Sequence, residues 1–257
     1  MKQLGIVLLL FGLLGCDERV RVLPEDADAL RALAQQGDAE AQYTLGFRYA
    51  TGRGVDQDDA EALRWYRQAA DQGEAEAQYT LGFWYATGRG VDQDDAEALR
   101  WYRQAADQGD AEAQFNLGVR YDTGRGVPQD RVAALRWYRL AARKGFARSQ
   151  YTLGVRYATG RGVPQDDVAA LRWYRLAAEQ GDAQAQFNLG VSYYEGKGVP
   201  LDAVRAHMWF NLAYSRMNGN SRVNAANNRD LIGRLMTPEQ IAEARHLASE
   251  WNATHSR

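Results

Sequence analysis

Four side chains that could recognise a partner recur at a constant spacing. Arg48, Trp84, Arg120 and Arg156 lie 36 residues apart, each three residues after a leucine that precedes a glycine. A guanidinium group offers planar donors to carboxylates or phosphates, and an indole offers a large flat face. This is the chemistry of binding rather than of bond breaking. We therefore expect these four residues to contact a partner.

Residues that could carry catalysis or hold a metal are scattered along the chain. The three histidines are His207, His246 and His255, and Glu243 with His246 forms one Glu-x-x-His pair where a di-iron bundle needs two. No serine has a lysine three residues later, as a Ser-x-x-Lys nucleophile requires. The sequence predicts no enzyme, no cofactor and no metal site.

The composition is that of an ordinary globular protein. The chain has 257 residues, of which 46% are hydrophobic and 25% charged, and its formal net charge is −2. Nucleic-acid binding needs a markedly basic surface, so this balance gives no support for such a partner.

The N-terminus has the pattern of an export signal. A short segment with Lys2 is followed by an apolar run that is too short to span a bilayer. Leu13, Leu14 and Gly15 before Cys16, the sole cysteine, resemble a bacterial lipobox. That resemblance implies that residues 1–15 are a lipoprotein signal peptide and that Cys16 is lipidated. A plain secretory signal or an incidental apolar start is the alternative.

The remaining chain is built from repeats. Hexapeptides such as AQYTLG at Ala41 and Ala77 recur every 36 residues, which defines five units, at 37–72, 73–108, 109–144, 145–180 and 181–216. The first two units differ only at Asp38/Glu74 and Arg48/Trp84. A period in this range is typical of solenoids, in which each unit is one supersecondary element.

Each unit contains two helical patterns, A and B. In the first unit Asp38 is expected to cap helix A, the glycines of TGRGV (51–55) end it, and Asp58 with Glu61 starts helix B in the manner of a capping box. Small residues such as Gly46 allow close approach of the backbones, while Phe146 leaves the fourth helix A poorly capped. The rest of the chain is expected to form a tether at 16–25, an N-terminal capping helix at 26–36 and C-terminal capping helices at 217–257. Within the last segment we expect a polar break at 218–224 and then a helix that begins at Thr237 and Pro238.

The four recurring side chains fall on one side of helix A. On a helical wheel Thr44, Arg48 and Thr51 point together, opposite Gly46. This stripe changes between units while the apolar positions hardly change. We expect it to face solvent and to bind a partner; neutral drift on an exposed face is the alternative.

The repeat pattern closely resembles the Sel1-like repeat, a relative of the tetratricopeptide repeat. The residues that carry the resemblance in the first unit are Ala41, Leu45, Gly46, Tyr49, Gly52, Gly54, Val55, Asp58, Ala62, Trp65, Ala69, Ala70 and Gly73. The resemblance implies an all-α, right-handed α/α solenoid whose A helices line a concave groove. It also implies a non-catalytic adaptor.

These observations favour an interaction scaffold in the bacterial envelope. The expected protein is a monomer tethered by Cys16 and facing the periplasm, and Asp17 favours the inner membrane over the outer one. Its expected partner is another protein with an acidic segment, or an anionic envelope glycan. Two alternatives stay open: a β-lactamase-like or penicillin-binding hydrolase, as suggested for cysteine-rich relatives, and a secreted or surface factor that acts on a host.

Overall fold

Helices form all of the regular secondary structure in residues 23–24 and 26–255, the part of the chain that the computed structural model describes. Thirteen helices lie in this part, without a strand. The prediction of an all-α repeat solenoid is confirmed. The A helices are α2 (Ala39–Thr51), α4 (Ala75–Thr87), α6 (Ala111–Thr123), α8 (Ala147–Thr159) and α10 (Ala183–Glu195); the B helices are α3 (Asp59–Asp71), α5 (Asp95–Asp107), α7 (Arg131–Arg143), α9 (Asp167–Glu179) and α11 (Ala203–Arg216); α1 (Ala27–Gln35) precedes them, and α12 (Gly219–Gly233) and α13 (Pro238–His255) follow.

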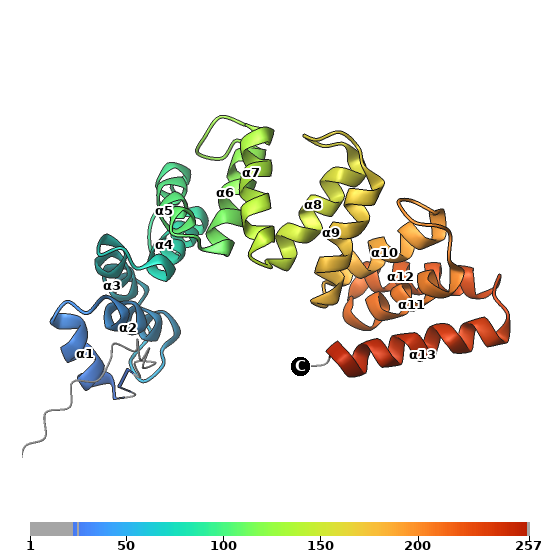
Figure 1. The fold of residues 1–257 in the computed structure, drawn as a ribbon. Helices are drawn as coiled ribbons and strands as arrows, with labels where there is room; N and C mark the ends of the chain where they lie inside the picture. Colours follow the sequence, from blue (N-terminus) through green and yellow to red (C-terminus); the bar gives the residue numbers. More distant parts are fainter. Residues whose placement is uncertain (1–22, 25, 256–257) are drawn as a thin grey trace, which may run out of the picture.

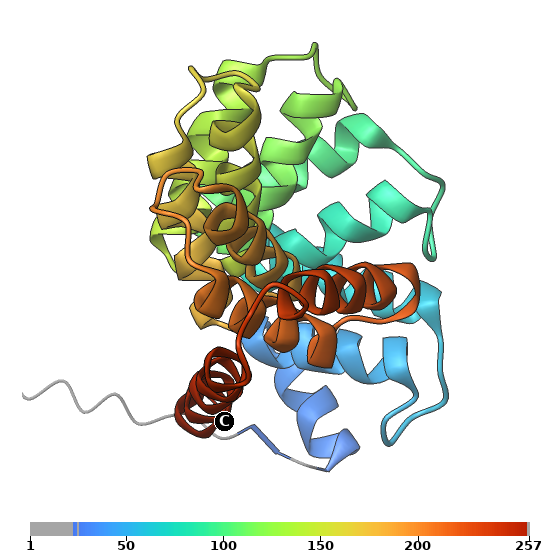
Figure 2. The ribbon, with the colours of Figure 1, turned by 90° about the vertical axis from the view of Figure 1, so that its right-hand side faces the viewer.

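The helix pairs follow one another along an arch (Figure 1). Helices α1 to α12 pack mainly on their neighbours in the chain, whereas α13 packs on α11. The view turned by 90° shows the pairs winding along a curved path (Figure 2). The hydrophobic core is consequently a series of small clusters between successive helices, as expected for a solenoid, rather than one central core.

An aspartate fixes the start of each B helix. Asp58 accepts hydrogen bonds from the backbone N–H groups of Ala60 and Glu61, at 2.9 and 3.0 Å. The Asp58 N–H itself donates to the carbonyl of Tyr49 at 2.9 Å, which folds the intervening loop back on helix A. In a full capping box the Glu61 side chain would accept from the Asp58 N–H. This part of the prediction is wrong, because Glu61 pairs with Arg64 and the Asp58 N–H donates to Tyr49.

The starts of the A helices differ between repeats. Asp38 accepts from the N–H of Ala41 at 2.8 Å, and the aspartates of the third and fifth repeats do the same. Phe146 provides no side-chain cap, as predicted. Glu74 provides none either, although it is acidic.

A glycine sets the distance between the two helices of each repeat. A Cβ atom at Gly46 would lie 2.8 Å from the ring of Tyr66, and the equivalent glycines meet an aromatic ring of helix B at comparable distances. No real Cβ tolerates such a contact without a shift of its neighbour. The predicted role of these small residues is confirmed.

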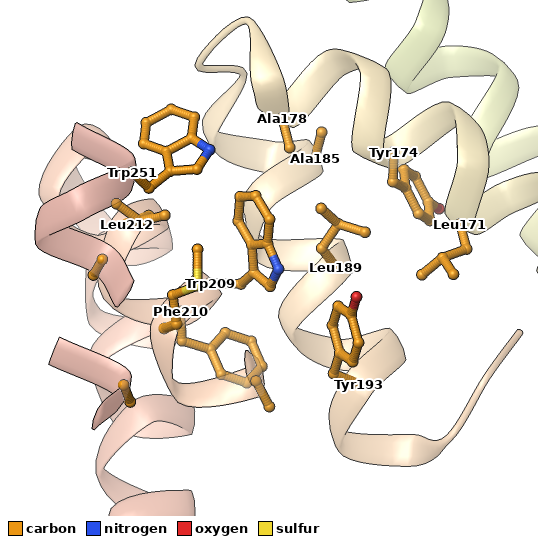
Figure 3. Packing of buried hydrophobic residues seen from close by; sticks show 14 of the residues in the cluster. Leu171, Tyr174, Ala178, Ala185, Leu189, Tyr193, Trp209, Phe210, Leu212 and Trp251 are labelled. Atoms are coloured by element: carbon orange, nitrogen blue, oxygen red, sulfur yellow. The ribbon is translucent and has the colours of Figure 1, made fainter. Parts of the chain in front are cut away.

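The C-terminal helix closes the last repeat. The Thr237 N–H donates to Oε1 of Gln240 at 2.9 Å, and the Gln240 N–H donates to Oγ1 of Thr237 at 3.3 Å, which confirms the predicted capping box. Trp251 packs edge-on against Trp209, with ring centroids 6.1 Å apart, and lies beside Leu212 (Figure 3). The expected polar break at 218–224 is wrong, because α12 begins at Gly219 and packs on α11.

The N-terminal signal segment and Cys16 lie outside the described residues. Within the described ranges, no helix combines the length and the apolar character that crossing a membrane requires.

Candidate functional site

The four recurring side chains lie between repeats. Trp84 is 3% exposed, Arg120 is 6% and Arg156 is 3% exposed, while Arg48 is half-buried. Each of the three buried side chains packs on an aromatic ring of the preceding B helix: Trp84 on Tyr66, Arg120 on Tyr102 and Arg156 on Tyr138. The expectation of solvent exposure is therefore wrong for Trp84, Arg120 and Arg156, whereas the threonines that end the stripe in the first four repeats are exposed.

The arrangement of neighbours around helix A explains this burial. Gly46 faces helix B of its own repeat, whereas Ala41 and Leu45 pack against Leu30 of the preceding helix. Around the helix, Arg48 lies only about 20° from Ala41. The side opposite Gly46 is therefore the interface with the preceding repeat. Because Trp84, Arg120 and Arg156 are buried, the structure does not support a role for them in binding a partner. The inference of an acidic or anionic partner depended on these residues and is not supported either.

The exchange of arginine for tryptophan is compensated inside this interface. In the third repeat Arg120 forms an ion pair with Asp95, with Nη1 2.8 Å from Oδ1. In the second repeat, where Trp84 stands instead, the equivalent Asp59 pairs at 2.8 Å with Arg89 from the following loop. The Arg89 guanidinium stacks over the Trp84 ring, 4.7 Å from its centroid. Indole and guanidinium are both flat, so either can fill the space next to the aromatic ring of helix B.

The exposed face of the A helices lies at a different angle, centred on Phe47. Phe47 and Phe83 are each 45% exposed, and valines occupy the equivalent positions in the other three repeats. Glu40 lies two turns before Phe47 on the same side of helix α2. We call the exposed residues Glu40, Phe47, Glu76, Phe83 and Glu112 the A surface.

Carboxylates crowd one edge of this A surface. Glu74, the residue that fails to cap α4, hydrogen-bonds through its side chain to Glu76. This hydrogen bond, together with burial and the charges of Glu76 and Glu40, raises the pKa of Glu74 to about 7. In the fourth and fifth repeats Arg148 and Gln184 replace the exposed glutamate. The acidic edge is thus confined to the first three repeats.

The histidines do not meet in one site. His207 is buried in α11, His246 pairs with Glu250 at 3.2 Å, and the ring of His255 stacks on Trp251 at 4.2 Å between centroids. Among the residues that the structure describes, no group of three His, Cys, Asp or Glu side chains could hold a metal ion.

Sequence reasoning missed Phe47 and Phe83. The available signal was that Ala41 and Leu45 lie on one packing side of helix A and Gly46 on another, which leaves the solvent side near position 47. Variation between repeats does not mark this surface, because the variation at position 48 reflects exchangeable packing between repeats.

Two adjacent aromatic residues, Phe83 and Trp84, differ in burial, so their substitution should change the stability of the fold by different amounts. Trp84→Ala should destabilise the fold by about 3–5 kcal/mol, because it empties a packed space between repeats. The matched control Phe83→Ala removes a half-exposed ring from the same helix and should cost about 1 kcal/mol or less. Denaturant unfolding of both variants measures the difference, and equal losses of stability would contradict the assignment of Trp84 to the core.

Comparisons with known proteins agree with this architecture. The family model described as Sel1 repeat matches residues 39–74, 75–110, 111–146, 147–182 and 183–216. None of the curated proteins matches the chain.

Two solved structures are similar over most of its length. One is a protective antigen present in uropathogenic Escherichia coli strains, which displays an SLR fold; it is 35% identical with a TM-score of 0.79 over 89% of this chain, and the chain spans 48% of that antigen. The other is a Sel1 repeat protein from Oxalobacter formigenes, 33% identical with a TM-score of 0.75 over 87% of this chain and 93% of its own. With five matched repeats that cover more than half of its residues, the chain belongs to the Sel1 repeat family.

Proposed function

We propose that the protein is an interaction scaffold whose A surface binds a basic, partly apolar segment of another protein. Sel1 repeat proteins are generally protein-interaction scaffolds, which supports a protein partner. The observation that carries the choice of surface is the pair of equivalent phenylalanines, Phe47 and Phe83, each 45% exposed. Aromatic side chains, phenylalanine among them, are enriched at the centres of protein interfaces.

Charge sets the kind of segment that fits. Glu40, Glu76 and Glu112 lie exposed in successive repeats, on the same side of the A helices as the two rings and about two turns before them. A lysine- or arginine-bearing segment would gain attraction along this row, and an acidic one would be repelled. The proposed partner therefore has the opposite charge to the one expected from the sequence.

Synthetic peptides test this proposal directly. A peptide that alternates lysine and phenylalanine should bind, and one with glutamate in place of lysine should not. Phe47→Ala with Phe83→Ala should weaken binding by about 2 kcal/mol, and Glu40→Gln, Glu76→Gln and Glu112→Gln together should remove its salt dependence. Fluorescence anisotropy measures both effects, with Val132→Ala plus Val168→Ala, two exposed valines of the B helices, as the matched control.

The pH dependence of binding has a definite sign. Because the pKa of Glu74 is about 7, its proton is lost as the pH rises through neutrality. The A surface then gains a negative charge, so the affinity for the lysine peptide should rise between about pH 6 and pH 8. Equal binding of both peptides, or loss of binding in the valine control, would contradict the proposal.

We also propose that the protein is an exported monomer held at the membrane by lipid on Cys16, with Asp17 favouring the inner membrane. The segment Leu13 to Cys16 supports export and lipidation, and Asp17 supports the inner membrane. Cys16→Ser removes the thiol that would carry the acyl chains on which stable anchoring depends. The variant should therefore move from the membrane fraction to the soluble fraction. A variant that still sediments with membranes would contradict lipid anchoring.

One observation favours the host-directed alternative, namely the 35% identity to a protective antigen. Protease treatment of intact cells separates the two locations. A chain that faces the periplasm is protected, and one on the cell surface is degraded.

The role as a non-catalytic scaffold follows the general character of the family. Hydrolysis of a chromogenic β-lactam by the purified protein would favour the enzyme alternative instead.

A further inference from the structure

A cavity lies at the C-terminal end of the solenoid, far along the chain from the A surface. Its volume is about 430 Å³, and its walls come from α11, α12 and α13. The lining side chains that carry the argument are His207, Asn211, Arg229, Arg234 and Arg245. Three arginines thus line one cavity that is partly open to solvent, and two of them, Arg234 and Arg245, are exposed.

Their charge is only partly neutralised. Asp230, the one acidic residue in the lining, already pairs with Arg229, with Nη2 2.8 Å from Oδ1. Within the described chain, Arg234 and Arg245 form no ion pair. Two uncompensated positive charges around a cavity favour an anion.

The fifth repeat departs from the other four where it faces this cavity. His207 replaces a leucine that the first four repeats share, and Asn211 replaces an arginine that they share. His207 is only 5% exposed, and its Nδ1 atom is buried without a hydrogen-bond partner in the part of the chain described. A buried polar atom of this kind is unfavourable for folding alone, so the exchange of leucine for histidine calls for another reason.

We propose that this cavity binds a small oxyanion, a phosphate or a carboxylate, with Arg234 and Arg245 supplying the charge and His207 and Asn211 supplying polar contacts. Guanidinium groups bind both anions through paired, charge-assisted hydrogen bonds. The proposal is independent of the A surface, which lies on the A helices of the first three repeats.

Histidine protonation gives the site a characteristic signature. Burial lowers the pKa of His207, and the positive charges of Arg229 on α12 and Arg245 on α13 lower it further, against a smaller opposite effect of Asp230. A bound anion would offset these positive charges and raise the pKa of His207. Binding would then take up a proton, so the affinity for the anion should increase as the pH falls.

Titration of the full chain with inorganic phosphate or with succinate, followed by NMR of the His207 ring, tests the proposal. Chloride keeps the ionic strength constant. Saturable shifts of the His207 signals and a higher His207 pKa are expected at millimolar anion, and the two arms show whether phosphate or carboxylate is preferred. Arg234→Gln with Arg245→Gln should weaken binding at least about tenfold, whereas the exposed pair Arg136→Gln with Arg172→Gln should leave it unchanged.

A second variant separates binding from folding. His207→Leu restores the residue of the other repeats and should fold at least as stably. The variant should lose the part of the pH dependence of anion affinity that His207 contributes and keep the part that comes from titration of the anion itself; calorimetry of wild type and variant measures the difference. No response to either anion at about 20 mM, or an equal response of wild type and the Arg234/Arg245 variant, would overturn the proposal.

Discussion

Every A helix after the first repeat is held between two B helices, its own and that of the preceding repeat. The glycine side meets the first, and the alanine and leucine side meets the second. These two contacts cover most of the circumference of the helix and leave one narrow strip in solvent. The strip determines which residues can recognise a partner, and it excludes Arg48 and Trp84, one of the two pairs of residues at which the duplicated repeats differ.

The contacts between repeats tolerate different chemistry because they are mainly contacts of flat groups. A tyrosine ring of helix B receives an indole in one interface and a guanidinium group in the next two. The aspartate that would lose its partner when arginine is replaced finds another arginine in the loop. A nearly identical pair of repeats can therefore differ at a buried site without losing an ion pair.

Much of the fold could be predicted from the sequence, because the period, the capping aspartates and the helix-ending glycines act locally. Residues close in sequence are enough to predict the helix pairs, the role of Gly46, the missing cap at Phe146 and the start of α13 at Pro238.

The candidate site could not be predicted in this way. Its position depends on which side of helix A meets the preceding repeat, and that contact joins residues 18 or more positions apart, such as Tyr66 and Trp84. The start of α12 at Gly219 was missed for a similar reason, because this polar segment forms a helix by packing against α11.

Side-chain accessibility in solution tests the central claim most directly. Hydroxyl-radical labelling with mass spectrometry reports on individual aromatic side chains, and Phe83 and Trp84 are neighbours on one helix with opposite environments. The structure predicts strong labelling of Phe47 and Phe83 and protection of Trp84, even though the indole is intrinsically the more reactive ring. Labelling of Trp84 at least as strong as that of Phe83 would contradict the packing of the A helices described above.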